Sequence, residues 1–265
     1  MKSKILFSLL FVSAAAFSSI LFMSKDEIPA FNLANAKILT PSHASDFDYS
    51  NIKNVTEKKQ IFFDTLRPII ENQNQIIRDN RQHALFARDH DIDIDWLTDI
   101  ANKYNIEWDN SSPQWDSLLN RMDTIPVELV MSQAANESAW GTSRFAKKGN
   151  NLFGQWCFKK GCGIVPGQRD AGTKHEVKKF DSINSSVASY MHNINTTRAY
   201  KSLRSIRSEL RSQNKPVDAM VLATGLEKYS SRGQAYVKEI QSMIKTNLPL
   251  MQGLNQTYVA KQEQE

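Results

Sequence analysis

The sequence lacks the patterns that mark common cofactor sites and strong nucleic-acid binding. It contains no glycine-rich phosphate loop, no EF-hand pattern and no Ser/His/Asp arrangement, so we expect no cofactor. Its 33 lysines and arginines against 28 acidic residues give a net charge of +5, which is too small to imply nucleic acid as a partner. With 265 residues, 41% of them hydrophobic, the chain is long enough to bury one sizeable core.

Cysteine is scarce as well. Cys157 and Cys162 lie five positions apart in QWCFKKGCGIVP, and a tight turn could close them into a disulfide in an oxidising compartment. Two free thiols are the alternative. A metal site would need more ligands than these two sulfurs and the nearby His175, so we expect no metal.

The N-terminus carries a long apolar run. Lys2 and Lys4 precede residues 5–23, which are apolar enough to meet a membrane. We expect residues 1–24 to be a signal peptide or a signal anchor, and we favour the anchor because no small-x-small cleavage site lies just beyond the run. The distribution of positive charge then predicts an exported, periplasmic protein, tied to the inner membrane if the segment is retained.

Apolar spacing predicts a mainly helical body after a polar linker over residues 25–51. A long helix begins near Thr56 with a kink at Pro68, and helices over residues 95–104 and 115–122 follow. We assign residues 52–114 to an N-terminal helical region and residues 251–265 to a polar tail. Pro126 is typical of the first turn of a helix, which we expect to run toward Gly141.

One acidic residue, Glu137, lies in the stretch QAANESAWGTSRFA, residues 133–146. On a helix that starts at Val127, Glu137 lies within about 20° of Val130, at the edge of the apolar stripe. A half-buried carboxyl group has a raised pKa, so it could hold a proton and act as a general acid. A surface glutamate is the alternative that spacing alone leaves open.

The segment GNNLFG, residues 149–154, follows, and it predicts a helix end at Gly149 and a sharp turn through two asparagines. Together the two motifs resemble the glucosaminidase domain family, glycoside hydrolase family 73, and its Bax-like bacterial members. The resemblance covers residues 115–250 and reaches more weakly back to residue 54. It implies an α+β fold: a mainly helical, lysozyme-like domain with a small β-lobe, preceded here by the long N-terminal helix.

The resemblance also implies an activity and a site. The activity is hydrolysis of the β-1,4 bond after N-acetylglucosamine in the glycan strands of peptidoglycan. Glu137 matches the family's catalytic acid, Glu176 fits the second acidic residue from the lobe, and Tyr229 matches a tyrosine near the cleaved bond, although Ser230, Ser231 and Arg232 depart from the family's motif. The candidate substrate-binding residues are Trp140, Asn150, Asn151, Phe153 and Trp156.

Two other functions stay open. A lytic transglycosylase also has a lone helical glutamate. Those enzymes, however, resemble each other in a turn of the Gly-Leu-Met-Gln type, where this sequence has Asn150–Gly154. A non-catalytic wall-binding module would make Glu137 structural.

A basic flank is a further feature of the sequence. It lies along the helix expected near residues 198–211 and is either a solvated face or a contact for an anionic polymer or lipid surface. Its members are Lys201, Arg204, Arg207 and Arg211.

Overall fold

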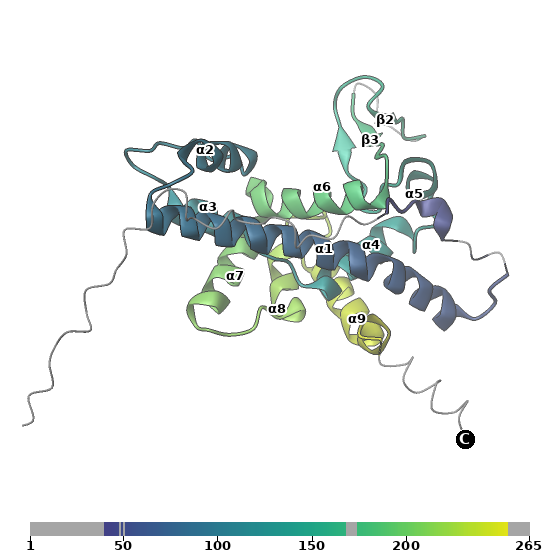
Figure 1. Ribbon diagram of the computed structural model, residues 1–265. Coiled ribbons are helices and arrows are strands. Elements are labelled where there is room, and N and C mark those ends of the chain that lie inside the picture. The colour runs from purple at the N-terminus through teal and green to yellow at the C-terminus, as the bar shows by residue number, and fades with distance from the viewer. Residues whose placement is uncertain (1–39, 48, 50, 168–173, 254–265) are drawn as a thin grey trace, which may run out of the picture. The chain divides into compact units, whose positions relative to one another are not determined.

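The computed structural model describes residues 40–47, 49, 51–167 and 174–253 (Figure 1). The apolar run at residues 5–23 and most of the polar tail lie outside these residues. Within the described ranges, no helix is long and apolar enough to cross a membrane.

The described chain is mainly helical with one small antiparallel sheet, so the predicted α+β class is confirmed. The α-helices are α1 (Val55–His90), α2 (Ile94–Lys103), α3 (Trp115–Arg121), α4 (Val127–Ser138), α5 (Arg144–Gly149), α6 (Ile183–Thr196), α7 (Lys201–Ser212), α8 (Ala219–Ala223) and α9 (Gln234–Met251). The strands are β1 (Trp156–Cys157), β2 (Gly163–Ile164) and β3 (Glu176–Lys178). Single 3-10 turns are η3 (Ala44–Asp46), η4 (Arg198–Tyr200) and η5 (Thr224–Leu226).

The predicted long N-terminal helix is α1, and it forms part of the main core. Asn54 caps it by accepting the backbone N–H of Thr56 at 2.8 Å, and the helix continues past Pro68. Its side chains Phe62, Phe63, Leu66 and Ile70 are fully buried. They face α4, α6 and α9, and α6 lies along α1 in Figure 1. One hydrophobic core therefore holds α1 against the helices that follow.

The helix that carries Glu137 ends earlier than predicted. α4 stops at Ser138, and the next two residues, Ala139 and Trp140, have positive φ angles of 50° and 58°. The Ser138 hydroxyl donates to the Ala134 carbonyl at 2.6 Å and accepts the Gly141 N–H at 2.7 Å, so a side chain closes the last turn. The predicted helix end at Gly149 is confirmed, but it belongs to a separate helix, α5.

The predicted basic flank is also wrong for two of its four residues. Arg204 and Arg207 are 6% and 1% exposed, and both point into the protein. Arg204 donates to the carbonyls of Ile194 and Thr197 at the end of α6, each at 2.9 Å. Helix ends leave carbonyls without partners, and arginine supplies the donors that satisfy them.

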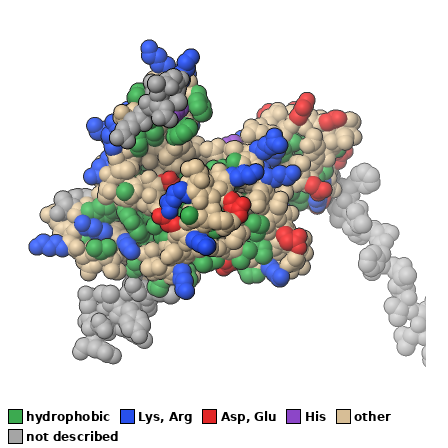
Figure 2. All heavy atoms as spheres, turned by 180° about the vertical axis from the view of Figure 1, so that it is seen from behind, with side chains coloured by type: hydrophobic (Ala, Val, Ile, Leu, Met, Phe, Trp, Pro, Cys, Tyr) green, Lys and Arg blue, Asp and Glu red, His purple; other side chains and the backbone are tan. Residues whose placement is uncertain are grey.

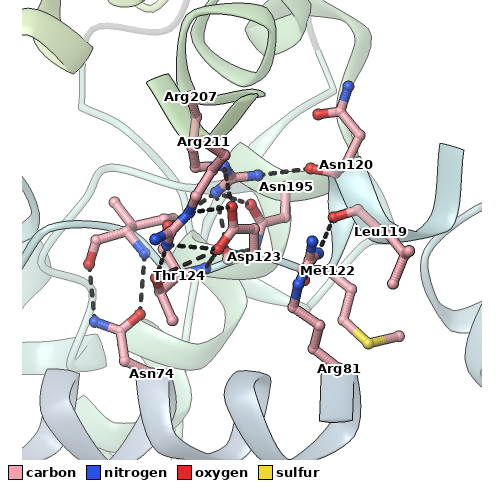
Figure 3. Close-up of polar contacts among 11 residues, drawn as sticks. Asn74, Arg81, Leu119, Asn120, Met122, Asp123, Thr124, Asn195, Arg207 and Arg211 are labelled. Carbon is pink, nitrogen blue, oxygen red and sulfur yellow. Dashed lines mark hydrogen bonds and ion pairs between the residues drawn. The ribbon is translucent and has the colours of Figure 1, made fainter. Parts of the chain in front are cut away.

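Arg207 is the centre of a polar cluster between α1, α3, α6 and α7 (Figure 3). Its guanidinium donates to the carbonyls of Asn120, Asp123 and Thr124 and to Asn195 Oδ1, at 2.8 to 3.0 Å. Burial lowers the pKa of Arg207 to about 10, and the Asp123 carboxylate opposes this effect. The same cluster joins the segment before α4 to three helices, and so fixes where α4 begins.

We expect Arg207→Met to destabilise the protein by about 3 to 5 kcal/mol, because it leaves the Asp123 carboxylate and several buried carbonyls without their donor. The measurement is urea unfolding followed by circular dichroism. Arg211→Met is the matched control, since Arg211 also contacts Asp123 but its side chain is 47% exposed. Equal losses in the two variants would contradict the structural role given to Arg207.

Candidate active site

The small sheet forms a lobe that the predicted disulfide closes. Its strand order is β1-β3-β2 with both pairings antiparallel, and Cys157 is bonded to Cys162. The prediction of a disulfide is therefore confirmed. Gly163 on β2 lies so close to β3 that a Cβ atom there would be 2.1 Å from the Val177 carbonyl oxygen, so this position requires glycine.

Glu176 lies on β3 inside this lobe and is only 6% exposed. One carboxylate oxygen accepts the Gly161 N–H at 3.0 Å and the other accepts the Gly163 N–H at 2.8 Å. Glu176 is therefore a buried residue and not a solvated one. Both sulfurs of the disulfide lie within 4.8 Å of this carboxylate, but the bond between the sulfurs leaves no thiolate for a metal.

The two predicted asparagines build the turn that leads into the lobe. Asn150 adopts a left-handed conformation with φ of 50° and donates to the Phe180 carbonyl at 3.0 Å. Asn151 is buried, and its amide donates to the carbonyls of Gln155 and Lys178 at 2.9 and 2.8 Å. These bonds tie the turn to β3, so both side chains are occupied with backbone groups.

An open cleft of about 470 Å³ lies between the lobe, α4 and α6. Of the sequence-predicted site residues, it brings together Glu137, Phe153, Trp156 and Tyr229, whereas Trp140, Asn150, Asn151 and Glu176 are not among the residues that line it. The full lining is Glu137, Phe153, Gly154, Gln155, Trp156, Tyr190, Asn193, Ile194, Tyr200 and Tyr229. Glu137 carries the only carboxylate in this set of described residues.

Trp140 lies in a different place. Its ring packs edge-on against Phe62 and Phe63, each at 5.5 Å between ring centroids, and the Lys59 ammonium lies over it at 5.1 Å. It lines a second cavity of about 730 Å³ near η3. The described lining of that cavity contains no carboxylate, so it has no acid with which to protonate a leaving group.

A directed chain of hydrogen bonds ends at Glu137. The Tyr190 hydroxyl donates to Gln133 Oε1, Gln133 Nε2 donates to the Tyr236 hydroxyl at 3.0 Å, and the Tyr236 hydroxyl donates to Glu137 Oε1 at 2.8 Å. Gln133 and Tyr190 are almost fully buried, as is Tyr236. The four groups come from α4, α6 and α9, so the chain locks these helices around the acid.

Sequence reasoning gave none of the three partners a role at the acid. Gln133 precedes Glu137 by four residues, and this helical spacing places the two side chains on one face, so a signal was present. Tyr236 lies 99 residues beyond Glu137, and no local pattern connects them.

The cleft raises the pKa of Glu137 above its ordinary value. Burial is the main cause, since it penalises the charged form; the hydrogen bonds from Tyr236 and Asn136 act in the opposite direction but do not cancel it. Both of these bonds end on Oε1, with Asn136 Nδ2 at 3.5 Å. No hydrogen bond to Oε2 is formed by the residues that the structure describes, so Oε2 is the oxygen that can carry a transferable proton.

Aromatic side chains line the walls of the cleft. Phe153 stacks on Tyr190 at 3.9 Å, and Tyr229 stacks on Tyr236 at 5.1 Å while its hydroxyl donates to the Phe153 carbonyl at 3.1 Å. Trp156 differs from them, because it is 58% exposed and stacks on His175 with one side of its ring. It therefore offers an apolar surface of the kind that packs against sugar rings.

Comparisons with known proteins point to one family. A model for the glucosaminidase family, described as mannosyl-glycoprotein endo-beta-N-acetylglucosaminidase, matches residues 112–248. Protein bax of Escherichia coli (strain K12) is 34% identical over 205 residues, which cover 74% of this chain and 72% of that protein. No solved structure matches the chain. Every residue that lines the cleft lies within the family match.

The raised pKa of Glu137 makes stability depend on pH. The folded protein binds this proton more tightly than the unfolded chain, so the free energy of unfolding falls as the pH rises from the unfolded value of about 4.3 through the folded value. We expect Glu137→Gln to raise Tm near neutral pH and to lose this advantage below about pH 4. Thermal unfolding at a series of pH values measures the difference.

Glu107→Gln, which removes an exposed glutamate, is the control for the loss of one negative charge. A Glu137→Gln protein that is less stable than the parent at neutral pH, or equally stable at every pH, would contradict the burial of an ionisable group at this position.

Proposed function

Since the chain belongs to the glucosaminidase family, we propose that it is an endo-β-N-acetylglucosaminidase that hydrolyses the β-1,4 bond after N-acetylglucosamine in peptidoglycan. The observation that carries the proposal is the half-buried Glu137 with a raised pKa in an open cleft lined by aromatic rings. Glycosidases need such a carboxylic acid to protonate the leaving oxygen.

In this mechanism Glu137 delivers its proton from Oε2 to the glycosidic oxygen. The Tyr236 hydroxyl bonds to Oε1 and holds the carboxyl group in position while the proton leaves. Once the proton has gone, the same bond stabilises the carboxylate, which must later accept a proton again. Tyr229 lines the cleft and stacks on Tyr236. We assign it the role of holding the loop at Phe153 and the Tyr236 ring in place.

The oxocarbenium-like transition state also needs a partner below the sugar ring. Both oxygens of Glu176 accept N–H groups of the lobe, and Glu176 is absent from the described lining of the cleft. We therefore propose that Glu176 maintains the lobe, and that the N-acetyl group of the substrate acts as the nucleophile, as it does in substrate-assisted glycosidases.

A lytic transglycosylase is the second candidate, because a single carboxylate in the described cleft lining also suits an enzyme that closes the sugar on itself. Such an enzyme releases an anhydro sugar, whereas a hydrolase releases a reducing end. For either activity we propose that residues 5–23 direct the chain out of the cytoplasm, where its substrate lies.

Digestion of purified peptidoglycan tests the activity. We expect the parent protein to release fragments with N-acetylglucosamine at the new reducing end, and Glu137→Gln to lower kcat by about 10² to 10⁴-fold, because general acid catalysis contributes that much. Mass spectrometry of borohydride-reduced fragments identifies the end. Anhydro ends would select the transglycosylase, and a muramic acid reducing end would make the protein a muramidase.

Tyr236→Phe tests the hydrogen bond to the acid. The Tyr236 bond lowers the pKa of Glu137, so its removal raises that pKa further and moves the basic limb of the kcat/KM profile to higher pH. Tyr229→Phe is the matched control, since the Tyr229 hydroxyl bonds to a backbone carbonyl instead. An unshifted limb in Tyr236→Phe, or the same shift in both variants, would refute this role for Tyr236.

A further inference from the structure

The lobe carries most of the positive excess of the chain. Residues 154–180 contain six lysines and arginines and two acidic residues. Glu176, the acidic residue of this segment that the structure describes, is buried and bonded to N–H groups. Lys159, Lys160, Lys174 and Lys179 are exposed, and Figure 2 shows basic side chains on the lobe, at the upper left.

Lys159 and Lys160 lie in the turn between the two cysteines of the disulfide. Both are exposed, and neither side chain has a hydrogen bond or ion pair to any residue in the described part of the chain. This distinguishes them from Arg204 and Arg207, whose guanidinium groups donate to backbone carbonyls inside the protein. This covalently closed turn therefore presents two available positive charges.

Exposed apolar groups accompany these charges. Trp156, Phe158 and Val165 are 58%, 75% and 51% exposed, and all three belong to the lobe. Trp156 is at the same time part of the cleft wall that contains Glu137. A chain segment spans at most about 3.5 Å per residue, so the Lys160 Cα lies within about 14 Å of the Trp156 Cα. Both lysines therefore lie on the segment that directly follows the Trp156 part of the cleft wall.

Charge complementarity indicates what that ligand carries. Apart from Glu137, the residues that line the cleft have neutral side chains. Two exposed ammonium groups on the neighbouring segment of the lobe suit carboxylates of a ligand. In peptidoglycan, carboxylates occur on the stem peptides, and on the lactyl group of muramic acid wherever the stem peptide has been removed. We propose, building on the proposed function, that Lys159 and Lys160 form a subsite that binds these carboxylate substituents and favours acidic glycan strands over neutral ones.

The experiment compares three substrates with the full chain. The first substrate is intact glycan strands with their stem peptides. The second is strands from which an amidase has removed the stem peptides, so that only the lactyl carboxylate remains. The third is intact strands whose carboxylates have been amidated with a carbodiimide. We expect Lys159→Glu/Lys160→Glu to lower kcat/KM on the intact strands by about tenfold, mainly by raising KM. The effect should be smaller at high salt, and kcat/KM on the amidated strands should not change. A loss on intact strands alone assigns the carboxylates of the stem peptides, a loss on stripped strands alone assigns the lactyl carboxylate, and a loss on both shows that the lysines bind either group.

Lys215→Glu/Lys245→Glu makes the same change of charge on exposed lysines outside the lobe and should leave all three rates unchanged. Lys159→Arg/Lys160→Arg should keep the parent rates, and Tm reports whether the lobe variants fold. Equal rates of Lys159→Glu/Lys160→Glu and the parent on both intact and stripped strands would overturn the subsite, as would an equal loss on amidated strands.

Binding separates this proposal from the proposed function. If the parent cleaves none of the substrates, co-sedimentation of Glu137→Gln with intact and amidated sacculi still tests the lobe. Tighter binding to intact sacculi, lost on adding Lys159→Glu/Lys160→Glu, supports the subsite. Should the lysine change instead weaken binding only to vesicles that contain anionic phospholipid, the lobe is a membrane contact and the subsite is wrong.

Discussion

The hydrogen bond from the Tyr236 hydroxyl to Glu137 is the contact on which the rest of the site depends. It requires α9 to lie against α4, and the bond from Tyr190 to Gln133 requires α6 to meet the same pair. α1 contacts all three helices through its apolar face, so one core holds the donors in register. The fold thus places a carboxyl group at low solvent exposure with one oxygen fixed and one available.

Positive charge is used in two different ways in this chain. Inside, arginines such as Arg204 and Arg207 satisfy carbonyls at helix ends, and they contribute to stability rather than to the surface potential. On the lobe, Lys159 and Lys160 remain in solvent beside the cleft. The net charge of +5 conceals this division, which appears only when burial is considered.

The long helix α1, the disulfide and the half-buried position of Glu137 could be predicted from the sequence, because each depends on local spacing. The end of α4 could not, since the Ser138 hydroxyl competes with the helix for backbone groups in a way that propensity does not reveal. The inward orientation of the Arg207 side chain depends on carbonyls up to 87 residues away in the sequence. Tyr236 was beyond local reasoning for the same reason.

The central claim is that burial outweighs the Tyr236 bond and keeps Glu137 protonated above its ordinary pKa. A titration of the Glu137 side-chain carboxyl carbon by ¹³C NMR measures this pKa directly, with Glu137→Gln identifying the resonance. The account predicts a midpoint clearly above the usual glutamate value of about 4.3. A midpoint at or below that value would contradict it, because the carboxyl group would then hold its proton no more tightly than an exposed glutamate does.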